Sequence, residues 1–192
     1  MARRPNPENR ERIVRTTRDL IRRNGVSGTT MLEVIAEAGG SRGSLYHYFP
    51  GGKAQMVEDA VRSSIDEYTA GIEYVVTLPP AEAIPLIVEV WRAEAEASGF
   101  TAGCPVVAAA LGGASEPHAR ELAGEAFAVW TTAISRMLVN NGVAAERADG
   151  LATTVLAAIE GAVVLGLAQQ SSEPMERVAA ELVALYDLVR EH

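Results

Sequence analysis

The side chains best suited to chemistry in this sequence gather at residues 41–49, in the run SRGSLYHYF. If residues 42–49 form a helix, Leu45 and Phe49 lie four positions apart and face inward together. The remaining side chains then face outward: Arg42, Gly43, Ser44, Tyr46, His47 and Tyr48. Arginine, serine and tyrosine can reach phosphate oxygens, and their tips can contact base edges in a major groove that admits a helix. The short helix therefore predicts contact with a nucleic-acid duplex.

The alternative for Tyr46 and His47 is a purely structural role in the packing of a short helix. The charge distribution favours the functional interpretation. Residues 1–53 contain ten Arg or Lys and five Asp or Glu, a net charge of +5, whereas the whole chain carries −8 and residues 54–192 therefore −13. An acidic body is repelled by a duplex, so this asymmetry should orient the basic end toward DNA.

The preceding residues predict the element that positions this helix. Thr30 can cap a helix start, and Glu33 stands three residues later as the second half of a capping box. Gly39 and Gly40 then stop that helix, because glycine accepts the left-handed backbone that a helix needs at its C-terminal end. Ser41 is the expected N-cap of the next helix. Helix, turn and second helix together predict a helix-turn-helix.

These residues also carry a resemblance. A helix, a glycine turn and SRGSLYHYF followed by Lys53 resemble the DNA-binding signature of the TetR family of bacterial transcriptional regulators. The segments FPGGK (49–53) and GCPV (103–106) resemble the LmrA/YxaF-like branch of that family. By this resemblance, the residues expected to contact DNA are Thr30, Arg42, Gly43, Ser44, Tyr46, His47, Tyr48 and Lys53.

The resemblance implies a homodimeric regulator, expected to be a repressor, that binds a palindromic DNA operator and is released from it by a small-molecule effector. Effector binding is expected to displace the helix that directly follows the basic end of the chain, residues 1–53. An effector-binding or scaffold protein without sequence-specific DNA recognition is the alternative. The sequence holds no constellation of catalytic residues that favours an enzyme, and no spacing of histidine and cysteine that favours a metal site or a cofactor.

Composition predicts an all-α fold. Hydrophobic residues make up 48% of the chain and aromatic residues only 5%, which suits a helical bundle rich in Ala, Val and Leu. Residues 1–53 are expected to form a three-helix DNA-binding domain, and residues 54–192 a helical bundle for effector binding and dimerisation. The charged N-terminus and the lone Cys104 predict a cytoplasmic protein.

Six further helices are expected after the DNA-binding domain, and the one over residues 145–169 is apolar nearly all round. Such a helix must be buried on both sides, so we expect one face to meet a partner chain together with the last helix, 173–190. The residues predicted for this dimer interface are Leu151, Val155, Ala158, Ala162, Gly166, Val178, Leu182, Leu185 and Val189. A membrane span is the weaker alternative, because Glu160 lies in its middle.

Scarce aromatic residues concentrate in the middle helices, where they could form the core or line an apolar effector cavity. The residues predicted for the effector site are Trp91, Phe100, Cys104, Phe127, Trp130, Met137 and Glu160. Glu160 has two possible roles, pairing with an arginine across the dimer interface or hydrogen-bonding a ligand. Cys104 is expected to be a small buried apolar residue rather than a sensor.

Overall fold

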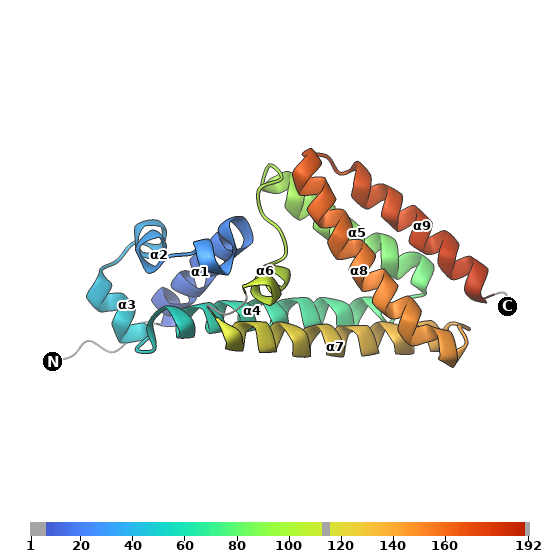
Figure 1. Ribbon diagram of the computed structural model, residues 1–192, viewed down its shortest axis with the longest axis horizontal. Coiled ribbons are helices and arrows are strands. Elements are labelled where there is room, and N and C mark those ends of the chain that lie inside the picture. The colour runs from blue at the N-terminus through green and yellow to red at the C-terminus, as the bar shows by residue number, and fades with distance from the viewer. Residues whose placement is uncertain (1–6, 113–115, 191–192) are drawn as a thin grey trace. The chain divides into compact units, whose positions relative to one another are not determined.

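The computed structural model describes residues 7–112 and 116–190, and within these ranges the regular structure is entirely helical (Figure 1). The helices are α1 (Pro7–Gly28), α2 (Met31–Ala38), α3 (Arg42–Tyr48), α4 (Gly52–Val75), α5 (Pro80–Ala97), α6 (Pro105–Leu111), α7 (Pro117–Asn140), α8 (Ala145–Gln169) and α9 (Glu173–Arg190). The predicted all-α class is confirmed. The chain divides into two compact units: residues up to Asp66 with Pro105–Gly124, and Glu67–Cys104 with Glu125 onward.

The first unit is organised around α1, whose inward face carries Ile13, Leu20 and Ile21. Helix α1 packs against α2 and α6. Helical backbone continues to Gly28, with a break at Gly25, where φ is 70°. Glycine adopts this positive φ without a steric penalty, so the chain can change direction there before α2.

The second unit is built on α5, α8 and α9, which pack against one another. Its core contains Ile84 and Val88 from α5, Val155 and Ile159 from α8, and Tyr186 from α9, all nearly inaccessible to solvent. The Tyr186 hydroxyl donates a hydrogen bond to the Asn141 carbonyl at 3.1 Å, which satisfies its polar tip.

Within the described residues, α8 is long and apolar enough to cross a membrane by length and composition alone. The core helix of a soluble protein passes the same test. Here α8 contacts both α5 and α9, and its Ala152, Val155, Ile159 and Val163 are buried by them. The structure therefore uses α8 as the core helix of its unit.

The small residues of α8 have a structural role inside the chain. Ala162 and Gly166 are buried, and a Cβ built on Gly166 would lie 2.7 Å from the Met175 Cε at the start of α9. Val155, Leu182 and Val189, also predicted for the dimer interface, lie in the same core, while Leu151, Ala158, Val178 and Leu185 are partly buried against it. Their contact with a partner stays a prediction. The large apolar side chains that remain exposed on these two helices are Val164, Leu165 and Leu188.

Candidate nucleic-acid interface and effector cavity

Helix α2 begins with the predicted capping box. The Thr30 hydroxyl accepts a hydrogen bond from the Glu33 amide at 3.2 Å, and the Glu33 carboxylate accepts one from the Thr30 amide at 3.0 Å. The hydrogen bond from the Thr30 side chain lowers the pKa of Glu33 below its ordinary value. The interaction satisfies backbone donors at the start of α2, where N–H groups have no partner within the helix, so it fixes where α2 starts.

The turn between α2 and α3 depends on two glycines. Gly39 caps α2 with φ 71°, and Gly40 follows at φ 146°, both in the region that side-chain-bearing residues avoid. Ser41 then starts α3, and its hydroxyl accepts a hydrogen bond from the Ser44 amide at 3.2 Å. The predicted helix-turn-helix is therefore present at the predicted residues.

Helix α3 is anchored by two side chains and exposes the others. Leu45 and Phe49 are buried, as predicted. The Arg10 guanidinium carbon lies 5.3 Å from the centroid of the Phe49 ring, and its Nη2 forms an ion pair with Asp59 at 2.6 Å. Arg10 thereby connects α1, α4 and the end of α3 within the first unit.

The residues predicted to contact DNA face solvent with two exceptions, Tyr48 and Lys53. The exposed members are Thr30, Arg42, Gly43, Ser44, Tyr46 and His47. Tyr48 is partly buried, and its hydroxyl accepts a hydrogen bond from Asn9 Nδ2 at 3.4 Å, while Lys53 is also partly buried at the start of α4. Exposed polar, aromatic and cationic side chains thus gather on one short helix, which is what a groove-reading element presents.

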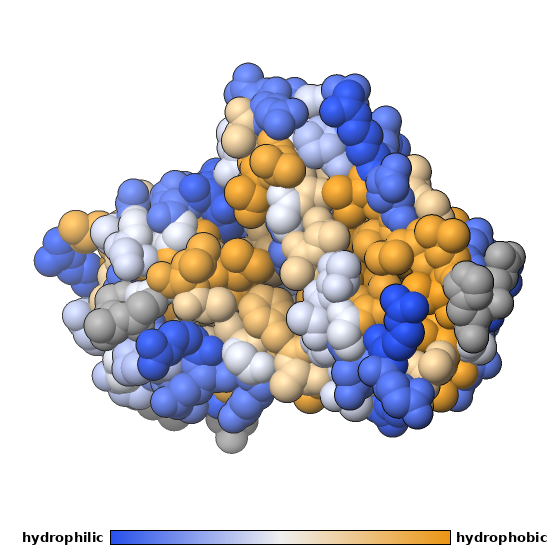
Figure 2. All heavy atoms as spheres, turned by 45° about the vertical axis from the view of Figure 1, so that its right-hand side comes forward, coloured by the Kyte–Doolittle hydropathy of each residue, from blue (hydrophilic) through white to orange (hydrophobic). Residues whose placement is uncertain are grey.

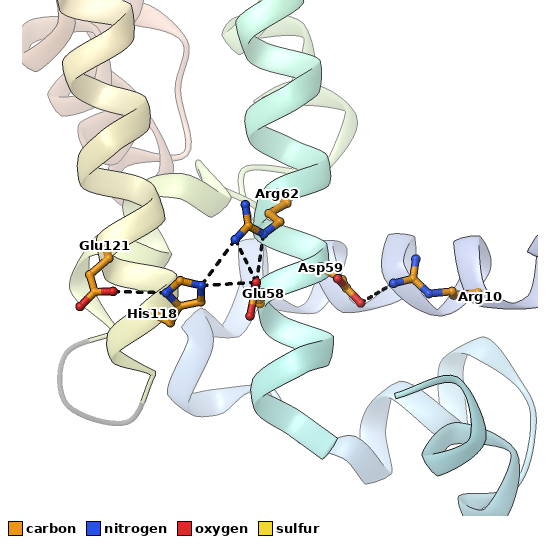
Figure 3. A network of polar contacts seen from close by, with 6 residues as sticks. All are labelled: Arg10, Glu58, Asp59, Arg62, His118 and Glu121. Carbon is orange, nitrogen blue, oxygen red and sulfur yellow. Dashed lines mark hydrogen bonds and ion pairs between the residues drawn. The ribbon is translucent and has the colours of Figure 1, made fainter. Parts of the chain in front are cut away.

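A second polar network supports the first unit away from α3 (Figure 3). On α4, Arg62 donates to Glu58 at 3.0 Å. His118 on α7 approaches the same Glu58 carboxylate at 3.4 Å through Nε2 and Glu121 at 3.2 Å through Nδ1. Sequence inspection missed this network, because the contact that joins its two halves, between Glu58 and His118, links residues far apart in the sequence.

The second unit contains a cavity of about 260 Å³ between α4, α5, α7 and α8. Its apolar wall includes Ile72 and Val75 from α4, Ile87 from α5, Ile134 from α7 and Ile159 from α8. The Tyr68 ring lies 5.3 Å from the Trp91 ring and 6.3 Å from the Trp130 ring, measured between centroids. The Trp130 indole nitrogen donates to Thr69 Oγ1 at 2.8 Å, which holds the ring in place.

Three of the residues predicted for the effector site line this cavity: Trp91, Trp130 and Glu160. The others belong to the second unit but are not part of the cavity lining. Met137 and Cys104 are buried, Phe100 packs against the core, and Phe127 contacts Trp130 edge-on with centroids 5.5 Å apart. Prediction from aromatic content missed the contribution of α4, because Tyr68, Gly71 and Ile72 resemble an ordinary helical stripe in sequence.

Glu160 lies at the cavity wall, and its hydrogen bond to a ligand stays a prediction. Burial raises the pKa of its carboxyl to about 7, and a hydrogen bond involving the Cys104 side chain opposes that shift. A carboxylate withdrawn from water in this way is poorly solvated when ionised. Within the residues that the structure describes, no cluster of three potential metal ligands accompanies it.

Together, the capped helix-turn-helix and the cavity-bearing helical unit define the class of helix-turn-helix transcriptional regulators. Residues 13–60 match the family of bacterial regulatory proteins described as the tetR family, and residues 80–181 match the C-terminal domain of LmrA/YxaF-like transcriptional regulators. The chain belongs to the TetR family, with an LmrA/YxaF-like C-terminal domain.

Relatives support the same assignment over nearly the full length. The chain is 32% identical over 178 residues to the HTH-type transcriptional regulator LmrA of Bacillus subtilis, covering 90% of this chain and 94% of LmrA. It is 30% identical over 182 residues to the regulator YxaF of the same organism, covering 93% and 95%. A putative transcriptional regulator from Saccharomonospora viridis, solved in complex with choline, shares the fold with a TM-score of 0.74, 22% identity and coverage of 93% and 97%.

Proposed function

We propose that this protein is a homodimeric repressor that binds a palindromic DNA operator and is released by a small-molecule effector. It would act in the bacterial cytoplasm. Residues 1–53 serve as the DNA-binding domain, and residues 54–192 bind the effector and form the dimer. The observation that carries this proposal is the anchored and capped α3, whose Arg42, Ser44, Tyr46 and His47 face solvent.

The geometry of α3 supports insertion into a major groove. Leu45 and Phe49 fix its inward face, so its outward face can approach a duplex without losing the core contacts. In a two-fold dimer, two copies of α3 would enter successive major grooves about 34 to 36 Å apart. Phosphate contacts from Thr30 and Lys53 would position the head, while the tips of Tyr46 and His47 reach base edges.

The cavity in the second unit supports control by a small molecule. Helix α4 supplies Tyr68, Ile72 and Val75 to its wall, and the same continuous helix begins directly after the DNA-binding head. An effector that moves α4 would alter the spacing of the two recognition helices. Such control requires the effector to bind the DNA-incompetent form more tightly, by about 1 to 3 kcal/mol for typical coupling.

The DNA-binding half is tested by selecting an operator from a random duplex pool with the wild-type protein. A Tyr46→Ala, His47→Ala double variant should bind the selected operator at least about tenfold more weakly at fixed salt, because each lost base or phosphate contact contributes about 1 to 3 kcal/mol. Fluorescence anisotropy of a labelled operator provides the measurement.

Tyr74→Ala is the matched control, since Tyr74 is 63% exposed on α4 and Tyr46 is 54% exposed on α3. The control should retain wild-type affinity, and circular dichroism should show that all variants remain helical. If the pool yields no enriched sequence, the scaffold alternative replaces the repressor. If the double variant binds normally, α3 does not read the operator.

A further inference from the structure

We propose that the effector of this cavity is a small, lipophilic organic cation, held by aromatic faces and balanced by carboxylates. This inference rests on the proposed function only in treating the cavity as an effector site. The preference for a cation follows from the lining itself and can be measured without DNA.

Aromatic faces are the first part of the argument. Tyr68, Trp91 and Trp130 contribute three rings from three helices to one cavity, with neighbouring centroids 5.3 and 6.3 Å apart. The face of an aromatic ring carries negative electrostatic potential, and tryptophan attracts a cation most strongly. Rings from separate helices that meet around a hollow provide several such faces to one ligand.

The charged groups are the second part. Every charged side chain among the described residues that line the cavity is a carboxylate: Glu67 on α4, Glu94 on α5 and Glu160 on α8. Each comes from a different helix, so the negative charge surrounds the hollow rather than one face of it. Ionised carboxylates here would repel an anionic ligand, whereas a cation would be attracted to each of them and would favour the ionised form of Glu160.

The apolar wall defines the remainder of the ligand. Isoleucine side chains from α4, α5, α7 and α8 leave no donor or acceptor over most of the surface, so a strongly hydrated inorganic cation would lose its water without replacement. A cation of low hydration, with its charge spread over methyl groups or an aromatic ring, suits both surfaces. At about 260 Å³, the cavity is small compared with the usual range of roughly 300 to 1,000 Å³, which favours a single-ring compound.

The test compares two molecules of the same shape. N,N,N-trimethylanilinium and tert-butylbenzene differ only in a quaternary nitrogen replaced by carbon. The chain has two tryptophans, Trp91 and Trp130, and both line the cavity, so tryptophan fluorescence reports binding directly. We expect the cation to bind about tenfold more tightly than its neutral analogue in the absence of DNA.

Variants test which carboxyl groups cause the preference for the cation over the neutral compound. A Glu94→Gln, Glu160→Gln double variant should bind the cation and the neutral compound with similar affinities, while Glu181→Gln, an exposed change on α9, should retain the difference. Single variants and thermal melting curves keep the comparison interpretable if the double variant is less stable. Equal or tighter binding of tert-butylbenzene by the wild-type protein, or binding of neither compound at millimolar concentration, would overturn the proposal.

The same titrations separate this inference from the proposed repressor function. Operator affinity is measured with and without saturating trimethylanilinium. Preferential cation binding with unchanged operator affinity supports the ligand class but contradicts release by this cation. Loss of operator affinity with tert-butylbenzene alone supports an effector-controlled repressor but contradicts the cationic ligand.

Discussion

At the scale of single residues, Glu160 has the most unusual environment among the groups discussed above. Burial raises the pKa of its carboxyl from 4.5 to about 7. The titratable groups that line the same cavity are Glu67 and Tyr68 on α4 and Glu94 on α5, and the Cys104 side chain shares a hydrogen bond with the carboxyl. Ionisation of Glu160 therefore costs more free energy in the folded chain than in the unfolded chain.

Glu160→Gln should accordingly stabilise the protein at alkaline pH. Below about pH 4.5 the carboxyl is protonated in both folded and unfolded chains, so the variant and wild type should unfold alike. As pH rises above that value the unfolded chain ionises first, and wild-type stability falls until the folded pKa is passed. At about pH 8 the variant should be more stable by up to about 3 kcal/mol.

Urea unfolding at several pH values, followed by circular dichroism, measures this difference. Glu181→Gln on α9 is the control for loss of an exposed negative charge. A Glu160→Gln variant that gains as much stability at pH 4 as at pH 8 would show that ionisation of the carboxyl is not the cause.

At the scale of elements, the helix-turn-helix depends on backbone geometry more than on buried area. Helix α3 is only seven residues long, so it cannot persist by its own propensity. Its start is fixed by Ser41 and the direction of the turn by Gly39, which has φ 71°. Strain at this turn should therefore affect stability and DNA affinity together.

Gly39→Ala should destabilise the protein by about 1 kcal/mol or more, because alanine at positive φ is strained although the surrounding space is open. Gly124→Ala on α7 is the matched change, since its Cβ also meets nothing within 4 Å but its backbone is helical. That variant should gain about 0.5 to 1 kcal/mol. Thermal denaturation and operator binding measure both effects, and equal responses of the two variants would contradict the role of the turn.

At the scale of the whole molecule, exposed apolar side chains indicate where a second chain would bind. Hydrophobic residues gather in patches on the face shown in Figure 2, separated by hydrophilic ones. On α8 and α9, Leu165 is 51% exposed and Leu188 62% exposed, and Val164 is exposed beside Leu165 in the sequence. Two such helices from each protomer can form a four-helix interface, which would cover these side chains.

If the protein is the dimer proposed above, a Leu165→Glu, Leu188→Glu double variant should convert it to monomers while remaining helical, because four carboxylates would be introduced into one apolar interface. Sedimentation velocity measures the change. Val129→Glu, at a valine that is 55% exposed on α7, should leave the dimer intact. A wild-type protein that sediments as a monomer would refute the dimer, and dissociation by Val129→Glu alone would place the interface elsewhere.

The sequence by itself determined the helix-turn-helix of this protein. Its caps and its turn depend on contacts between residues at most four positions apart: Thr30 with Glu33, the glycine turn and the Ser41 cap. Such contacts can be recognised from the local sequence pattern. The same run of residues carried the TetR-family resemblance. The positions of the last two helices, residues 145–169 and 173–190, followed from apolar periodicity for the same reason.

Tertiary structure alone decided which faces of the body helices meet. It placed Gly166 against Met175 inside one chain, although Gly166 was predicted for the dimer interface. It also gathered Tyr68, Trp91, Trp130 and Glu160 from four helices around one cavity and left Phe100 and Met137 outside it. Periodicity states that a helix has an apolar face, but only packing between residues distant in sequence selects the neighbour that this face contacts.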